Sequence, residues 1–152
     1  MKTVVVGIGN PNFKDDGVGL KIVEELQGVV DTVSLLNISF QIIDSILGYD
    51  KVIIVDGVKS GTEPGSIVEF SSDYWANIYA SGTHNLSIFE IIRIGYKLFP
   101  EEMPKEIKII GVEVEDVETL SRECSPKVVA AIPEAVARIK EYLNIQHVQN
   151  AL

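Results

Sequence analysis

The sequence has little of what builds disulfide-bonded, secreted or membrane-spanning proteins. Its single cysteine, Cys124, excludes an internal disulfide and cannot form a thiolate metal site by itself. No stretch approaches the roughly 20 consecutive apolar residues that a membrane-spanning helix needs. The apolar run near the N-terminus is too short for a signal peptide. We therefore expect a cytoplasmic protein without membrane insertion.

Basic residues are also scarce. The chain has 13 Lys and Arg residues against 22 Asp and Glu residues, which gives a formal net charge of -9 at pH 7. The basic residues form no cluster along the sequence. Because a surface of this sign repels a phosphate backbone, we expect no nucleic-acid partner.

Length and composition indicate one globular domain over residues 1–152. Hydrophobic residues make up 46% of the chain and charged residues 23%, as in ordinary globular proteins. A domain of this size buries roughly 70% of the surface that its unfolded chain exposes, so it needs no disulfide or structural metal to stay folded.

Strand-like and helix-like segments alternate along the chain. Apolar, β-branched runs predict strands over residues 3–8, 31–38, 51–55, 66–70 and 106–114. Helical spacing of apolar residues predicts helices over residues 17–26, 40–47, 88–99 and 126–143, the last kinked or restarted at Pro133. This alternation predicts a single three-layer α/β/α domain with a twisted, mostly parallel sheet of about five strands.

Sequence signals for helix starts accompany these segments. Asp15 or Asp16 is a suitable N-cap for the first helix. Ser87 with Glu90 three residues later forms a capping-box pattern. Pro126 stands at the favoured first position of the last helix.

Three polar residues follow predicted strands, where ligand sites of open α/β sheets lie. Asp16 follows the first strand, Asp56 the third, and His84 precedes the helix after the fourth. Two carboxylates and an imidazole together would suit nickel or zinc with open coordination positions. Each residue also has a plainer interpretation: Asp16 as a helix cap, Asp56 as a turn residue and His84 as a solvated loop residue.

A dinucleotide site is the alternative for the first loop, because Gly7 and Gly9 follow the first strand. The third glycine of that fingerprint is missing, since Asn12 stands in its place. Asp15 and Asp16 would also repel a pyrophosphate there.

The motifs together resemble those of the hydrogenase maturation endopeptidases. The N-terminal signature is carried by Gly-Ile-Gly-Asn at residues 7–10 and Asp-Asp-Gly-Val-Gly at residues 15–19. Ile-Ile-Val-Asp at residues 53–56 is similar to the second motif of that family, and Thr-His-Asn at residues 83–85 is similar to its third. Ile-Ile-Gly-Val at residues 109–112, before Ser125 and Pro126, is similar to the C-terminal portion. The resemblance covers nearly the whole chain.

This resemblance implies that Asp16, Asp56 and His84 are both the catalytic and the nickel-contacting residues. The nickel would be supplied by the protein substrate, a [NiFe] hydrogenase large-subunit precursor, whose C-terminal extension is removed after nickel insertion. Asp16 in Asp-Asp-Gly and His84 in Thr-His-Asn place the chain nearer the proteases of hydrogenase-3-type or coenzyme F420-reducing hydrogenases. We expect a monomer.

The sequence leaves two catalytic mechanisms open. The chain lacks His-Glu-x-x-His and Gly-x-Ser-x-Gly, so the common protease machineries are absent. Either the precursor's nickel activates the scissile carbonyl or a water, or one carboxylate acts as general base. A non-catalytic module that checks nickel during hydrogenase assembly is the rival interpretation, and the acidic body could help to receive a basic segment of the precursor.

Overall fold

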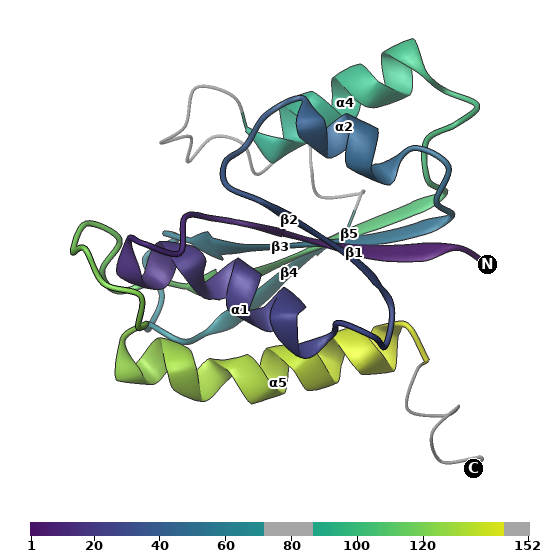
Figure 1. The fold of residues 1–152 in the computed structure, drawn as a ribbon. Coiled ribbons are helices and arrows are strands. Elements are labelled where there is room, and N and C mark those ends of the chain that lie inside the picture. Colours follow the sequence, from purple (N-terminus) through teal and green to yellow (C-terminus); the bar gives the residue numbers. More distant parts are fainter. Residues whose placement is uncertain (72–86, 145–152) are drawn as a thin grey trace.

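A computed structural model describes residues 1–71 and 87–144, which form a sheet covered by helices on both faces (Figure 1). Helices α1 and α5 cover one face, and α2 and α4 cover the other. The elements are β1 (Thr3–Ile8), the 3-10 helix η1 (Lys14–Gly17), α1 (Val18–Glu25), β2 (Asp31–Leu35), α2 (Gln41–Ile46), β3 (Lys51–Val58), β4 (Ile67–Ser71), α4 (Ile88–Leu98), β5 (Glu106–Glu113) and α5 (Pro126–Tyr142). The predicted three-layer α/β/α fold is confirmed.

The sheet has five strands in the order β2-β1-β3-β5-β4. β2, β1, β3 and β5 are parallel, and only β4, at one edge, runs antiparallel to its neighbour. The carboxyl ends of the four parallel strands therefore meet at one edge of the sheet. This edge, called the carboxyl edge below, is where the sequence predicted the site.

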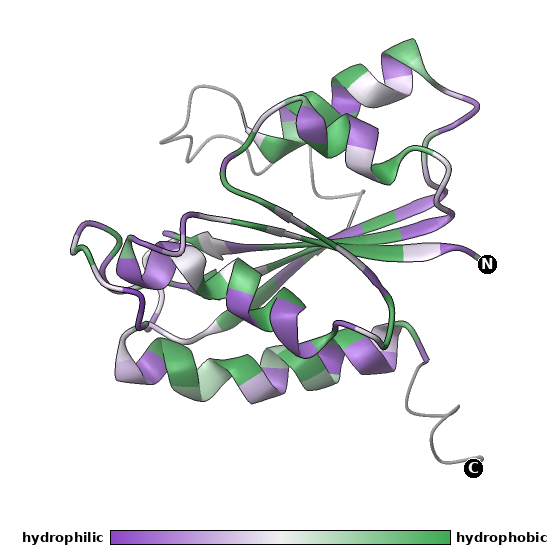
Figure 2. Cartoon of the chain, viewed as in Figure 1, coloured by the Kyte–Doolittle hydropathy of each residue, from purple (hydrophilic) through white to green (hydrophobic). Residues whose placement is uncertain are grey.

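Alternate residues of the central strands point to opposite layers. In β1, Val5 packs with the α1 and α5 side while Val4 and Val6 pack with the α2 and α4 side. Figure 2 shows the central strands as mostly hydrophobic and the helices on both sides as mixtures of hydrophobic and hydrophilic residues. Burial on both faces explains why β1 and β3 read as uninterrupted apolar runs.

Two strand ends differ from the prediction by three residues, and one predicted helix restart is absent. β2 ends at Leu35 rather than residue 38, because it pairs only with β1, and the last residue of β1, Ile8, lies opposite Leu35. β3 continues through Asp56 to Val58, because β5 offers pairing partners beyond the apolar run. α5 continues through Pro133, so the predicted restart is wrong. Pro133 is exposed, which lets water bind the carbonyl that its missing N–H leaves without a partner.

The observed helix N-caps match the predicted ones only in part. Ser87 is the N-cap of α4, and its hydroxyl accepts a hydrogen bond from the Glu90 backbone N–H (3.2 Å), as predicted. The predicted capping of α1 by Asp15 or Asp16 is wrong, because Gly17 is the N-cap and no side chain caps it. Within residues 1–71 and 87–144, no helix combines the length and apolar character needed to cross a membrane.

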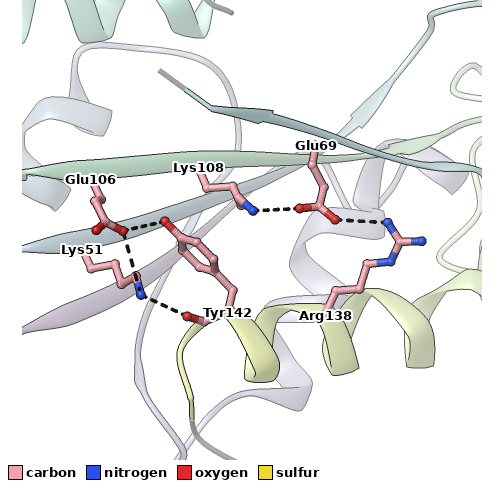
Figure 3. A network of polar contacts seen from close by, with 6 residues as sticks. All are labelled: Lys51, Glu69, Glu106, Lys108, Arg138 and Tyr142. Carbon is pink, nitrogen blue, oxygen red and sulfur yellow. Dashed lines mark hydrogen bonds and ion pairs between the residues drawn. The ribbon is translucent and has the colours of Figure 1, made fainter. Parts of the chain in front are cut away.

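A polar network joins the end of α5 to the sheet, at the opposite end from the carboxyl edge (Figure 3). The Tyr142 hydroxyl donates to Glu106 (2.9 Å), and Lys51 donates to the Tyr142 carbonyl oxygen (3.0 Å). The ammonium groups of Lys51 and Lys108 lie 4.2 and 4.3 Å from the centre of the Tyr142 ring. Glu69 accepts from Lys108 and Arg138 beside them. The network therefore fixes the last turn of α5.

Replacing Tyr142 by phenylalanine should lower the free energy of unfolding by about 0.5–1 kcal/mol, because it removes one hydrogen bond and keeps the ring. Burial, followed by the bond to Glu106, raises the pKa of Tyr142 to about 12. A raised folded-state pKa means that this stabilisation is present below pH 10 and lost as pH rises through about 12. Urea unfolding at pH 7 and pH 9 should therefore give the same loss. If Tyr142→Phe were as stable as the wild type at pH 9, this prediction would be wrong.

Candidate active site

Glycines bring the first loop against the carboxyl edge. A Cβ added to Gly9 would lie 1.9 Å from the Asp16 carbonyl oxygen, and the φ of Gly9 is +150°. A Cβ on Gly19 would lie 2.6 Å from the Val55 carbonyl oxygen and 2.8 Å from that of Ile8. Only glycine permits these approaches of backbone to backbone. The glycines of the first motif are thus explained by packing of η1 and α1 on β1 and β3, without a nucleotide.

This packing holds Asp16 in η1 at the end of β1. The Asn10 backbone N–H donates to Asp16 Oδ2 (2.8 Å). Its other carboxylate oxygen accepts no hydrogen bond from residues 1–71 or 87–144, and the side chain is half-buried. One carboxylate oxygen of Asp16 is therefore available to a ligand.

Asp56 lies near the end of β3, within the electrostatic range of Asp16. Its Oδ1 accepts a hydrogen bond from the Gly57 backbone N–H (2.8 Å). Burial raises the pKa of Asp56 well above its ordinary value, and the negative charge of Asp16 raises it further, although the Gly57 bond opposes this. The Asp56 side chain lies deep among other protein atoms but is still partly accessible to solvent. The structure thus brings together two of the three predicted site residues.

Neither carboxylate has a balancing cation in the described part of the chain. No Lys or Arg there forms an ion pair with Asp16 or Asp56. Two like charges held together at a partly desolvated edge favour a bound cation or a proton. The arrangement can therefore contribute oxygen ligands to a metal, or one carboxylate can carry a proton.

The third predicted residue, His84, lies outside the described residues. Residues 1–71 and 87–144 contain no group of three His, Cys, Asp or Glu side chains arranged to hold a metal ion. The predicted ligand set of Asp16, Asp56 and His84 accordingly remains a prediction.

Sequence reasoning missed the role of Asp15. Its side chain is fully buried and accepts hydrogen bonds from the N–H groups of Glu115 (2.9 Å), Asp116 (2.9 Å) and Ser125 (2.6 Å), and from the Ser125 hydroxyl (2.8 Å). Burial alone would raise the pKa of Asp15, but these hydrogen bonds together lower it. Asp15 therefore ties the Asp16 turn to the loop between β5 and α5.

Glu113 has a similar role at the end of β5. Its carboxylate accepts from the Ser60 hydroxyl (2.5 Å), the Ser60 N–H (3.0 Å), the Gly61 N–H (3.2 Å) and the Thr62 hydroxyl (3.0 Å). Burial would raise the pKa of Glu113, and these bonds lower it. Glu113 thereby holds the loop that follows β3. An acid directly after the apolar run of residues 109–112 was the signal in the sequence.

The chain is similar to known proteins along most of its length. The family model "Hydrogenase maturation protease" matches residues 20–142. The hydrogenase expression/formation protein HupD of Thiocapsa roseopersicina is 26% identical over 149 residues, which are 92% of this chain and 66% of that protein. The coenzyme F420 hydrogenase subunit delta of Methanothermobacter thermautotrophicus is 28% identical over 165 residues, 93% of this chain and 94% of that protein.

A solved structure shares the fold. The [NiFe] hydrogenase maturation protease HybD from Thermococcus kodakarensis superposes with a TM-score of 0.79 at 22% identity, covering 93% of this chain and 99% of that one. The family match spans well over half of the chain and includes Asp56. The chain therefore belongs to the hydrogenase maturation protease family, and its class of activity is that of a peptidase.

Proposed function

We propose that this protease removes the C-terminal extension of a [NiFe] hydrogenase large-subunit precursor after nickel has been inserted. The observation that carries the proposal is the pair of carboxylates, Asp16 and Asp56, at the carboxyl edge without a balancing cation in the described part of the chain. A nickel ion already bound in the precursor would supply the missing positive charge. The pair would then engage only a loaded precursor strongly.

The carboxylates take different parts in the proposed hydrolysis. Asp16, with one oxygen free of hydrogen bonds from the described residues, would contact the nickel together with His84. Burial, and then the charge of Asp16, raise the pKa of Asp56. A carboxylate with a raised pKa is a better acceptor for a proton from water at neutral pH. The water oxygen attacks the scissile carbonyl, Asp56 takes the proton, and the proton passes to the leaving amine.

The proposed ligand set also suits inspection of nickel. One carboxylate and one imidazole, with a second carboxylate beside them, form a weak site for free nickel compared with sites richer in nitrogen and sulfur. A protease of this kind can therefore contact the precursor's metal without removing it.

The substrate type is proposed from two further features. The Asp-Asp-Gly and Thr-His-Asn motifs favour a hydrogenase-3-type or coenzyme F420-reducing hydrogenase precursor. The similarity to a protein named coenzyme F420 hydrogenase subunit delta supports the second of these.

Intact-mass analysis of the precursor tests this function. The purified protein is mixed with large-subunit precursor that is either nickel-loaded or nickel-free. We expect the loaded precursor alone to lose a short C-terminal peptide. Equal cleavage of both forms would contradict the role of nickel, and stable binding of the loaded precursor without cleavage would favour the assembly-module alternative.

A further inference from the structure

The loop between β5 and α5, residues 114–125, lies against the turn that carries Asp16 (Figure 1). Phe13 and Ser121 form a parallel β-bridge, in which the Lys14 N–H donates to Ser121 (2.8 Å) and the Ser121 N–H donates to Asn12 (2.9 Å). The side chain of Arg122 also donates to Asn12 (3.2 Å). The loop therefore packs directly against the turn that leads into Asp16.

The loop is fixed from both ends. Asp15 binds the N–H groups of Glu115, Asp116 and Ser125, as described above. The Asp116 carboxylate accepts from the Glu118 N–H (2.9 Å), the Thr119 N–H (3.0 Å) and the Thr119 hydroxyl (2.6 Å). A surface held in one conformation before binding loses little further entropy when a partner arrives.

An exposed leucine lies within this fixed loop. Leu120 is 75% exposed, more than any other large apolar side chain of the described residues except Met1. Phe13, on the opposite side of the β-bridge, is 37% exposed. An exposed apolar side chain on a loop that is already ordered can bury its area against a partner without the cost of first ordering the backbone. Leu120 and Phe13 are thus exposed apolar side chains on the two segments that this β-bridge joins.

Two acidic residues flank Leu120 in the sequence, and the one basic residue between them, Arg122, binds Asn12. Glu118 and Glu123 are exposed, and neither forms an ion pair within residues 1–71 and 87–144. Asp15 and Asp116, by contrast, use their charges inside the structure. The surface therefore fits a polypeptide segment that is apolar with neighbouring Lys or Arg residues.

We propose that Leu120, Phe13 and the carboxylates of Glu118 and Glu123 form a docking surface for a basic, apolar segment of the precursor, beside the bond that is cleaved. This inference rests on the proposed function for its partner. The contact determines which precursor is accepted and is separate from the chemistry at Asp56.

Kinetics with the nickel-loaded precursor test the docking surface. Leu120→Ala should raise KM about tenfold and leave kcat unchanged, because it removes apolar contact area and no catalytic group. Glu118→Gln with Glu123→Gln should raise KM at low salt and have less effect at high salt. Leu98→Ala is the matched control for the leucine, since Leu98 is 64% exposed at the far end of α4. Glu24→Gln with Glu25→Gln, exposed on α1, is the control for charge.

Photocrosslinking separates this inference from the proposed function. Leu120→benzoylphenylalanine should crosslink to the nickel-loaded precursor, and Leu98→benzoylphenylalanine should not. Cleavage by the wild type with an unchanged KM in Leu120→Ala and no crosslink would overturn the docking surface alone. A crosslink specific to position 120 without any cleavage would support the docking surface and overturn the proteolytic function.

Discussion

Asp56→Asn is expected to abolish cleavage of the nickel-loaded precursor, with a loss of at least about a thousandfold in kcat/KM. The asparagine keeps an oxygen for the Gly57 N–H, so the local backbone is retained. It cannot accept a proton from water and carries no charge toward a metal. Asp16→Asn should also abolish cleavage if Asp16 contacts nickel. The measurement is intact mass of the precursor over time.

The same substitution should stabilise the protein at neutral pH. Because the folded-state pKa of Asp56 is raised, its contribution to stability is present at low pH and is lost as pH rises through that pKa. At pH 7 the buried charge beside Asp16 is therefore unfavourable, and the neutral amide removes it. We expect Tm at pH 7 to rise by roughly 2–4 °C, which corresponds to about 1 kcal/mol for a domain of this size.

Asp44→Asn is the matched control, since Asp44 is exposed on α2. It should leave both cleavage and Tm unchanged. The difference in Tm between Asp56→Asn and the wild type should shrink toward pH 4, where the carboxyl group is protonated. If Asp16→Asn and Asp56→Asn both cleaved the precursor at the wild-type rate, this pair would have no part in the mechanism.

The sequence was sufficient for the architecture because its signals are strong and local. Apolar β-branched runs marked β1 and β3, and helical spacing marked α1 and α4. The antiparallel direction of β4 was not readable, since an isolated edge strand has the same pattern in either direction. The end of β3 was also missed, because pairing with β5 extends it past its apolar run.

The candidate site was predictable only where position alone determines function. Asp16 follows the end of β1 and Asp56 lies near the end of β3, and the parallel sheet brings these strand ends together. Sequence could not show which of the adjacent acids Asp15 and Asp16 faces the interior, because one step along η1 decides it. Long-range hydrogen bonds to residues about 100 positions away determine that Asp15 is the buried one.

Asp15 and Glu113 are the two acidic residues among the described ones that solvent scarcely reaches, and both hold loops at the carboxyl edge. Burying a charge is unfavourable unless hydrogen bonds replace its water. Both residues accept enough bonds to keep their pKa values below the ordinary range. Rigid loops on both sides of Asp56 are therefore a property of this edge, consistent with a site that must hold a polypeptide in one position.

Asp15→Asn should lower the free energy of unfolding by about 2–4 kcal/mol at pH 7, because an amide nitrogen would then face a backbone N–H in place of a carboxylate oxygen. Because hydrogen bonds lower the folded-state pKa of Asp15, its contribution is present above about pH 5 and is lost as pH falls through that pKa. Urea unfolding between pH 3 and pH 7 should show the deficit of the variant decreasing toward low pH.

Ser125→Ala gives the matched comparison, because it removes one donor and leaves the Asp15 carboxylate and its three N–H partners in place. Its loss should be smaller, about 1–2 kcal/mol. If Asp15 also holds the docking loop, Asp15→Asn should raise KM for the precursor at a temperature where the variant is still folded, while Ser125→Ala changes KM little. If Asp15→Asn were as stable as the wild type at pH 7, Asp15 would not fasten this loop to the Asp16 turn.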